Sequence, residues 1–310
     1  MGFARAEAEG KVIIIITGYI LPGKQGLLDK PVKVPNTNIE IIRPFDGSKL
    51  KAVLFDLDGT LSLERDGWIN LMIKVFVDEL VKAGVKEKEA LMWSIKYIQD
   101  TIGITTYVQM QALADEIKQR GGMPKHAWKY KQDYNKELVE LVEKQRKELP
   151  KDKLRVAGIL ELLKLLAARF GKNSLYIGSA SDIDAVLSSV SFLGYDDFFD
   201  KNNIVGAGSV NDPKADSKKL VIDKLMNEQG LKLGELLCFG NGFPEILHTY
   251  NAGGICIGVL TPDESKYKDY FTVEQRREIL INAGAHIVMP DYTCSSELVK
   301  LLLAGKQPQR

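Results

Sequence analysis

The chain has 310 residues, of which 45% are hydrophobic and 27% charged, so it can build a globular core, and its length suggests about two domains. With 42 Lys and Arg against 41 Asp and Glu, the net charge of +1 gives no indication of binding to nucleic acid or to an acidic membrane surface. Three widely spaced cysteines, Cys238, Cys256 and Cys294, argue against a disulfide framework or a structural zinc site. We therefore expect a cytoplasmic protein.

Residues 1–50 are expected to form an N-terminal extension without chemistry of its own. The apolar run VIIIITGYIL, residues 12–21, is shorter than the roughly 20 residues that span a bilayer. Acids at positions 7 and 9, with no small-residue cleavage site after the run, argue against a signal peptide. We predict a strand over residues 12–17, followed by a Gly- and Pro-rich stretch and a short alternating piece, IEIIRPF.

The next segment, AVLFDLDGTLS, covers residues 52–62 and combines an apolar run with two acids, Asp56 and Asp58. The apolar run predicts a buried strand. Asp and Gly are common where a strand enters a turn, so the acids alone do not require a catalytic explanation.

Residues 66–150 are predicted to be helical. Apolar residues recur there at helical spacing in three stretches, and no convincing strand is present. Gly121, Gly122 and Pro124 interrupt the pattern, and the sequence LPKD at residues 149–152 ends it.

After residue 150, predicted helices and strands alternate. Helices are predicted over residues 156–171, 182–194, 216–230 and 295–305, and strands over 174–178, 235–240, 254–260 and 285–290. The strands are continuous apolar runs, which is typical of parallel strands buried on both faces. We therefore predict an α/β fold, a Rossmann-like doubly wound parallel sheet over residues 51–65 and 151–310, with the helical block of 66–150 inserted after its first strand.

Polar side chains follow three of these strands. Asp56 and Asp58 follow the first, Ser179 and Ala180 the second, and Asn241 and Glu245 the third, while Lys218 opens the helix before the third strand. In open parallel sheets, ligands bind at the carboxyl ends of the strands. These residues are therefore expected to converge at one edge of the sheet.

The order and spacing of these motifs resemble those of the haloacid dehalogenase-like superfamily of phosphotransferases. FDLDGT at residues 55–60 looks like its first motif, YIGSAS at 176–181 like its second, and residues 217–245 like its third and fourth. The helical block resembles the superfamily's helical cap, in the position also used by phosphoglycolate phosphatases and β-phosphoglucomutases. The resemblance implies a magnesium-dependent phosphatase acting on a small phosphorylated metabolite, such as a sugar phosphate or a phosphoglycolate-like acid.

The resemblance also implies a role for each residue. Asp56 would be the nucleophile that forms an aspartyl-phosphate, and Asp58 the general acid and base. Ser179 and Lys218 would stabilise the phosphoryl charge, with Gly59, Thr60 and Ala180 in the phosphate-binding loops. Mg²⁺ would be held by Asp56, the backbone carbonyl of Asp58, Asn241 and Glu245.

Several alternatives stay open from the sequence. Asn241 replaces the usual Asp, which predicts weaker metal binding and allows a non-catalytic binding module; a phosphomutase would use the same residues. Lys214 rivals Lys218 for the lysine role, and the loop of residues 101–107 can either face the leaving group or simply join two helices. One of three tryptophans, Trp68, Trp93 and Trp128, could line the pocket. We expect Ser181 and Asp182 to cap a helix. Dehalogenation is disfavoured, since a halide needs no proton from Asp58.

Overall fold

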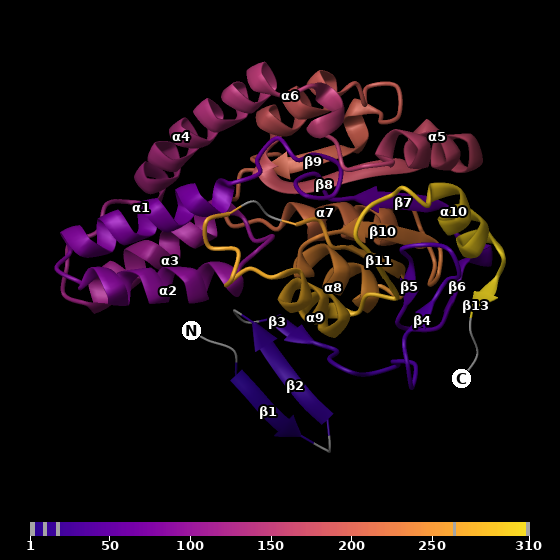
Figure 1. Cartoon of the computed structure of the whole chain (residues 1–310), viewed down its shortest axis with the longest axis horizontal. Coiled ribbons are helices and arrows are strands. Elements are labelled where there is room, and N and C mark those ends of the chain that lie inside the picture. Colours follow the sequence, from indigo (N-terminus) through magenta and orange to yellow (C-terminus); the bar gives the residue numbers. More distant parts are fainter. Residues whose placement is uncertain (1–3, 9–10, 17–18, 263–264, 308–310) are drawn as a thin grey trace.

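The computed structural model describes residues 4–8, 11–16, 19–262 and 265–307, and its centre is an eight-stranded sheet (Figure 1). The strand order is β4-β5-β12-β11-β10-β7-β8-β9, in which the six strands from β12 to β9 are parallel. Their bounds are β7 Ala52–Phe55, β8 Leu175–Asp182, β9 Ile204–Ala207, β10 Leu236–Gly240, β11 Ile255–Val259 and β12 Ile287–Met289. The edge strands β5 (Glu40–Ile41) and β4 (Val32–Lys33) come from the extension and pair antiparallel. The predicted α/β class with a parallel sheet is confirmed.

Helices cover both faces of the sheet, and this explains why its strands read as continuous apolar runs. One hydrophobic cluster joins Val53 and Phe55 to α5 (Ile159–Phe170), α6 (Ile183–Leu193) and α10 (Ser295–Leu303). On the opposite face, Leu54 packs with α7 (Ser217–Asp223), while α8 (Phe243–Asn251) and α9 (Val273–Ala283) share a neighbouring cluster. Strand β7 is buried along its whole length because alternate side chains enter both layers.

Between residues 151 and 305, the sequence prediction missed one strand and two helices: β9, α8 and α9. Strand β9 has four residues and contains a glycine, so its apolar signal is too short to recognise. Helix α9 is rich in charged residues, and only its Thr272–Gln275 capping box marks where it begins. The predicted helix of residues 216–230 is shorter than expected, since α7 passes into a π-helical turn at Lys224–Glu228.

The predicted helical block between β7 and α5 consists of four helices, one more than the three stretches recognised in the sequence, and they pack around a hydrophobic cluster of their own. They are α1 (Trp68–Lys82), α2 (Glu87–Gln99), α3 (Thr106–Gln119) and α4 (Ala127–Glu148). Figure 1 shows them beside the sheet, with α4 reaching toward α6. Among the described residues, no helix is both long and apolar enough to cross a membrane.

The N-terminal extension forms a separate antiparallel sheet of β1 (Ala4–Ala8), β2 (Lys11–Ile16) and β3 (Tyr19–Leu21). The strand predicted over residues 12–17 corresponds to β2, and Thr17 itself lies outside the described residues. Near the other terminus, β13 (Lys306–Gln307) pairs with β6 (Phe45–Asp46) of the extension.

One buried arginine attaches the extension to the core. Arg43 is only 2% exposed, and its guanidinium donates to the carbonyl oxygens of Gly23 at 2.7 Å, Ala285 at 2.8 Å and Gln25 at 3.0 Å. Burial lowers the pKa of Arg43, and the guanidinium also lies 5.7 Å from the centre of the Tyr250 ring. The carbonyls come from both the extension and the core, so Arg43 bonds the two together.

We therefore expect Arg43→Met to lower the free energy of unfolding by about 3 kcal/mol, because it leaves three carbonyl groups without their donor. Urea denaturation followed by circular dichroism measures this change. Arg169→Met, which removes an exposed arginine from α5, is the matched control and should change stability by less than about 0.5 kcal/mol. Equal effects of the two substitutions would contradict the proposed anchoring role.

Candidate active site

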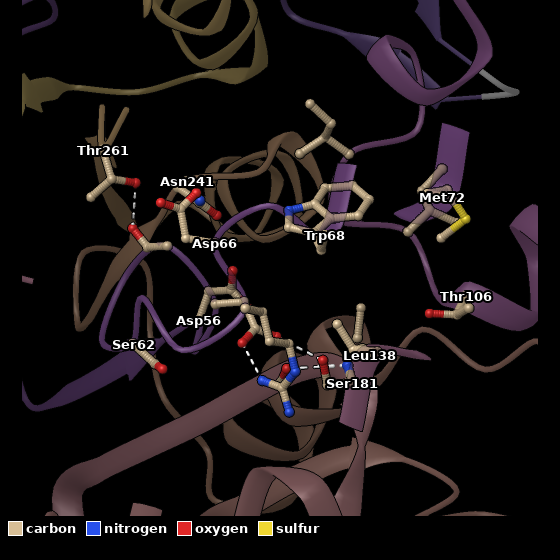
Figure 2. Close-up of a pocket in the computed structure, with 18 of the residues that line it drawn as sticks. Asp56, Ser62, Asp66, Trp68, Met72, Thr106, Leu138, Ser181, Asn241 and Thr261 are labelled. Carbon is tan, nitrogen blue, oxygen red and sulfur yellow. Dashed lines mark hydrogen bonds and ion pairs between the residues drawn. The ribbon is translucent and has the colours of Figure 1, made fainter. Parts of the chain in front are cut away.

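A cavity of about 120 Å³ lies between the carboxyl ends of the central strands and the four-helix segment, residues 68–148 (Figure 2). Seven of the residues singled out from the sequence line it: Asp56, Asp58, Gly59, Ser179, Ala180, Lys218 and Asn241. The expected convergence at one sheet edge is therefore found. Thr60 and Glu245 are fully buried and do not line the cavity.

The loop after β7 fixes the two acids. The Asp56 amide continues the sheet ladder by donating to the Phe239 carbonyl of β10 at 3.0 Å. The chain then turns sharply: the amides of Leu61 and Ser62 donate to the Leu57 carbonyl at 2.8 and 2.9 Å, and the Gly59 amide donates to the Ser62 carbonyl at 2.7 Å. The acids therefore stand at the start of a tightly hydrogen-bonded turn.

Position 59 of this turn requires glycine for two reasons. Its φ of +73° lies in the left-handed region, which side chains other than glycine rarely adopt. A β-carbon there would also lie 1.7 Å from Nδ2 of Asn241, so the amide of Asn241 packs directly against the backbone of the acidic loop. The turn thereby brings Asn241 next to the two acids.

Lys218 connects two carboxylates beneath the cavity. It is 1% exposed, and its Nζ lies 2.6 Å from Oε2 of Glu245 and 3.3 Å from Oδ1 of Asp56. The other oxygen of Glu245 accepts the Gly242 amide at 2.7 Å, at the start of α8. The rival residue, Lys214, is exposed in the loop before α7. The geometry thus selects Lys218 as the lysine beside Asp56.

Burial and charge act in opposite directions on the titration of this pair. Burial raises the pKa of Asp56 to about 8; Lys218 opposes this rise, and the neighbouring Glu245 and Asp58 carboxylates add to it. For Lys218, burial favours the neutral amine, but Asp56 and Glu245 outweigh it and raise its pKa. A further cation beside Asp56 would lower its pKa and favour the ionised carboxylate.

Asp58 is held by two donors. Its Oδ2 accepts a hydrogen bond of 2.6 Å from the hydroxyl of Ser181, and its Oδ1 is ion-paired with the buried guanidinium of Arg65 (Figure 2). The expectation that Ser181 caps a helix is wrong, because its hydroxyl points to Asp58 instead. The Ser181 amide donates to Oγ of Ser179 at 3.2 Å, which orients the second predicted site serine.

Asp182 occupies the N-cap position of α6, as expected, but its side chain makes no capping bond there. It is ion-paired with Lys131 and accepts a 2.8 Å hydrogen bond from Asn135, both on α4. In a second contact, Ser265 donates to Asn70 of α1 at 2.9 Å. The four-helix segment is thus bonded to the core at α4 and at α1.

The donor set at the cavity floor fits Mg²⁺. Asp56, the backbone carbonyl of Asp58 and the amide of Asn241 would hold the ion, with water and phosphate as its other ligands. Within the described part of the chain, no three His, Cys, Asp or Glu side chains form a metal cluster. Glu245 fits less well than expected as a direct ligand, because Lys218 and the Gly242 amide already occupy its two oxygens.

Several cavity residues were missed or left open by the sequence. Arg65 and Asp66 were not singled out, although they stand in a charged run, ERD, between the acidic loop and the first predicted helix. Of the three tryptophans, Trp68 lines the cavity. The loop of residues 101–107 faces the site, since a β-carbon at Gly103 would lie 3.4 Å from Nζ of Lys218.

Comparisons with known proteins agree with this geometry. A family model for haloacid dehalogenase-like hydrolases matches residues 50–247, which is more than half of the chain. The chain therefore belongs to the haloacid dehalogenase-like hydrolases. A search of curated proteins found no match.

Several solved structures have the same fold. A β-phosphoglucomutase from Clostridium difficile has a TM-score of 0.55 at 15% identity, and the match covers 82% of this chain and 97% of that protein's chain. A phosphonoacetaldehyde hydrolase-like protein from Oleispira antarctica has a TM-score of 0.53 at 14% identity, with coverages of 85% and 98%. A predicted phosphoglycolate phosphatase from Haemophilus somnus has a TM-score of 0.51 at 18% identity, with coverages of 82% and 98%. At these identities the likeness establishes the fold alone.

We expect Lys218→Met to lower the free energy of unfolding by about 3–5 kcal/mol, because it leaves Asp56 and Glu245 buried without their shared cation. Lys214→Met removes the exposed lysine four residues earlier and should change stability by less than about 0.5 kcal/mol. Urea denaturation at pH 7 compares the two variants. Similar stabilities would show that the ion pair contributes little to holding the site together.

Proposed function

We propose that this protein is a magnesium-dependent phosphatase that hydrolyses a small phosphomonoester through an aspartyl-phosphate intermediate. The observation that carries this proposal is the group at the cavity floor: Asp56 beside the buried ammonium of Lys218, with Asp58 and Ser179 at the same cavity. The family assignment supports hydrolysis as the general class of reaction.

In the proposed mechanism, a carboxylate oxygen of Asp56 attacks phosphorus, and the bond from phosphorus to the leaving alcohol breaks. Asp58 donates a proton to the leaving oxygen, and then accepts one from the water that cleaves the aspartyl-phosphate and restores Asp56. Lys218 and the hydroxyl of Ser179 stabilise the negative charge on the phosphoryl oxygens. A bound Mg²⁺ would reduce the repulsion between the Asp56 carboxylate and the phosphate.

In this proposal, residues 66–150 act as a cap that covers the substrate and excludes bulk water. The contacts of Asp182 with α4 and of Ser265 with α1 support this role, since they bond the four-helix segment to the core that carries the site.

A phosphomutase would use the same residues. Such an enzyme must allow a phosphorylated intermediate to reorient within the site, so that a second hydroxyl faces the phosphoryl group. The match to a hydrolase family supports hydrolysis over transfer of the phosphoryl group to a second hydroxyl. The presence of both Asp56 and Asp58 supports an enzyme over a binding module, in spite of Asn241.

Release of phosphate from p-nitrophenyl phosphate tests the proposal. We expect turnover that requires Mg²⁺ and falls by about a thousandfold or more in Asp56→Asn, because the amide is a poor nucleophile. Asp152→Asn, at an exposed position, should keep the wild-type rate. Turnover that survives Asp56→Asn would rule out Asp56 as the nucleophile. A folded wild-type protein without turnover would count against a phosphatase.

Asn241→Asp tests the proposed metal site. The substitution keeps the shape of the side chain and adds a negative charge, so we expect about tenfold less Mg²⁺ to give half-maximal phosphate release. Asn241→Ala, which removes the oxygen, should shift the requirement in the opposite direction. An identical Mg²⁺ dependence in all three proteins would show that residue 241 does not contact the ion.

A further inference from the structure

The wall of the cavity opposite Asp56 is largely apolar. The four-helix segment contributes Trp68, Met72, Ile102, Ile104 and Leu138 to this wall. In Figure 2, Trp68 projects toward the centre of the cavity, with Met72 and Leu138 placed around the same space. The leaving group of the substrate would therefore contact mainly hydrocarbon side chains and an indole ring.

Most polar groups near this wall already have partners. Gln109 is 2% exposed, and its Nε2 donates to the carbonyl and the hydroxyl of Thr101, each at 3.1 Å. Arg65 is paired with Asp58, and Lys218 with Asp56 and Glu245. Among the described residues of the wall, four groups are left to meet a substrate: the hydroxyls of Thr106 and Tyr134, the indole N–H of Trp68 and the amide oxygen of Gln109.

The size of the cavity sets a second limit. Its volume of about 120 Å³ is below the roughly 150 Å³ of an engineered protein cavity that binds benzene. The phosphoryl group itself must take part of this space. The pocket is partly open to solvent, so this volume favours a short leaving group without fixing its length.

We propose that the physiological leaving group is a short alcohol with an apolar body, not a sugar and not a carboxylic acid. The inference rests on the proposed phosphatase function and narrows its substrate. The hydroxyls of a sugar would give up water without enough hydrogen-bond partners in this wall, which opposes binding. A terminal carboxylate would lose hydration beside Lys218 and Arg65, which are already paired with Asp56, Glu245 and Asp58. The third cation of the cavity, Arg276, also has a partner, since it donates to the Thr261 carbonyl at 2.6 Å.

The test measures binding, so that it does not depend on turnover. Three phosphonates of matched length serve as probes: butylphosphonate, 3-hydroxypropylphosphonate and 3-phosphonopropionate, with glucose 6-phosphate as the sugar probe. Isothermal titration calorimetry of the full chain with Mg²⁺ gives each dissociation constant. We expect butylphosphonate to bind about tenfold more tightly than 3-hydroxypropylphosphonate, and more tightly than the other two probes.

A matched pair of variants assigns this preference to the wall. Leu138→Asn places an amide of similar size in the cavity and should reduce the tenfold preference to about twofold or less. Leu141→Asn makes the same change on the same helix, at a position that lines a separate surface groove, and should keep the preference. Circular dichroism checks that both variants fold, and the wild-type comparison stands without them.

Each result has a definite meaning. Tighter binding of the hydroxylated, carboxylated or sugar probe by the wild type overturns the apolar leaving group, even if phosphate release supports a phosphatase. A preference that survives Leu138→Asn unchanged overturns its assignment to this wall. Selective binding of butylphosphonate without any phosphate release supports the apolar site and overturns the phosphatase function alone.

Discussion

The site depends on one buried ammonium group placed between two buried carboxylates. Burying an ion removes its hydration, at a cost of several kcal/mol, so Lys218, Asp56 and Glu245 are tolerated in the interior only as a set. Lys218 belongs to α7, Asp56 follows β7, and Glu245 lies in the first turn of α8. Because each needs the others, these three elements are held in one arrangement.

This constraint extends from the ion pair to the rest of the site. Glu245 also accepts the amide of Gly242, which fixes the loop that carries Asn241. Asn241 in turn packs against Gly59, where a side chain larger than hydrogen has no room. The acidic loop, the asparagine and the lysine are therefore positioned through one chain of contacts, and the oxygens of the first two provide the place for a metal cation.

Much of this arrangement could be predicted from the sequence, because its signals are local. Continuous apolar runs identified the buried parallel strands, and the position of Asp56, Ser179 and Asn241 after such runs predicted that they meet. Other features depend on tertiary contacts that no local pattern encodes. Ser181 and Asp182 look like helix caps in sequence, yet they bind Asp58 and α4, since those partners are 123 residues distant from Ser181 and 47 to 51 residues from Asp182.

Tertiary contacts also decide the positions of Thr60, Glu245 and Lys218, which the sequence alone could not give. The motif alone does not show that the Thr60 side chain is directed into the interior. Nor does it show that the two carboxylate oxygens of Glu245 accept hydrogen bonds from Lys218 and a backbone amide. The choice between Lys214 and Lys218 required the position of α7, which brings only the second lysine next to Asp56. Arg65 was not predicted as a site residue, because Asp58 was assigned an acid and base role that does not call for an arginine partner.

The attachment of the helices at α4 and at α1 has a kinetic consequence. The bonds of Asp182 to Lys131 and Asn135, and of Ser265 to Asn70, bridge the core and the helices around the cavity. A movement of the helices away from the core would have to break some of these bonds. One bridge contains a partly exposed ion pair, whose attraction is weakened by dissolved ions. Where product release requires this movement, the dwell time of a product in the cavity would therefore shorten as ionic strength rises, while the apolar wall itself is insensitive to such screening.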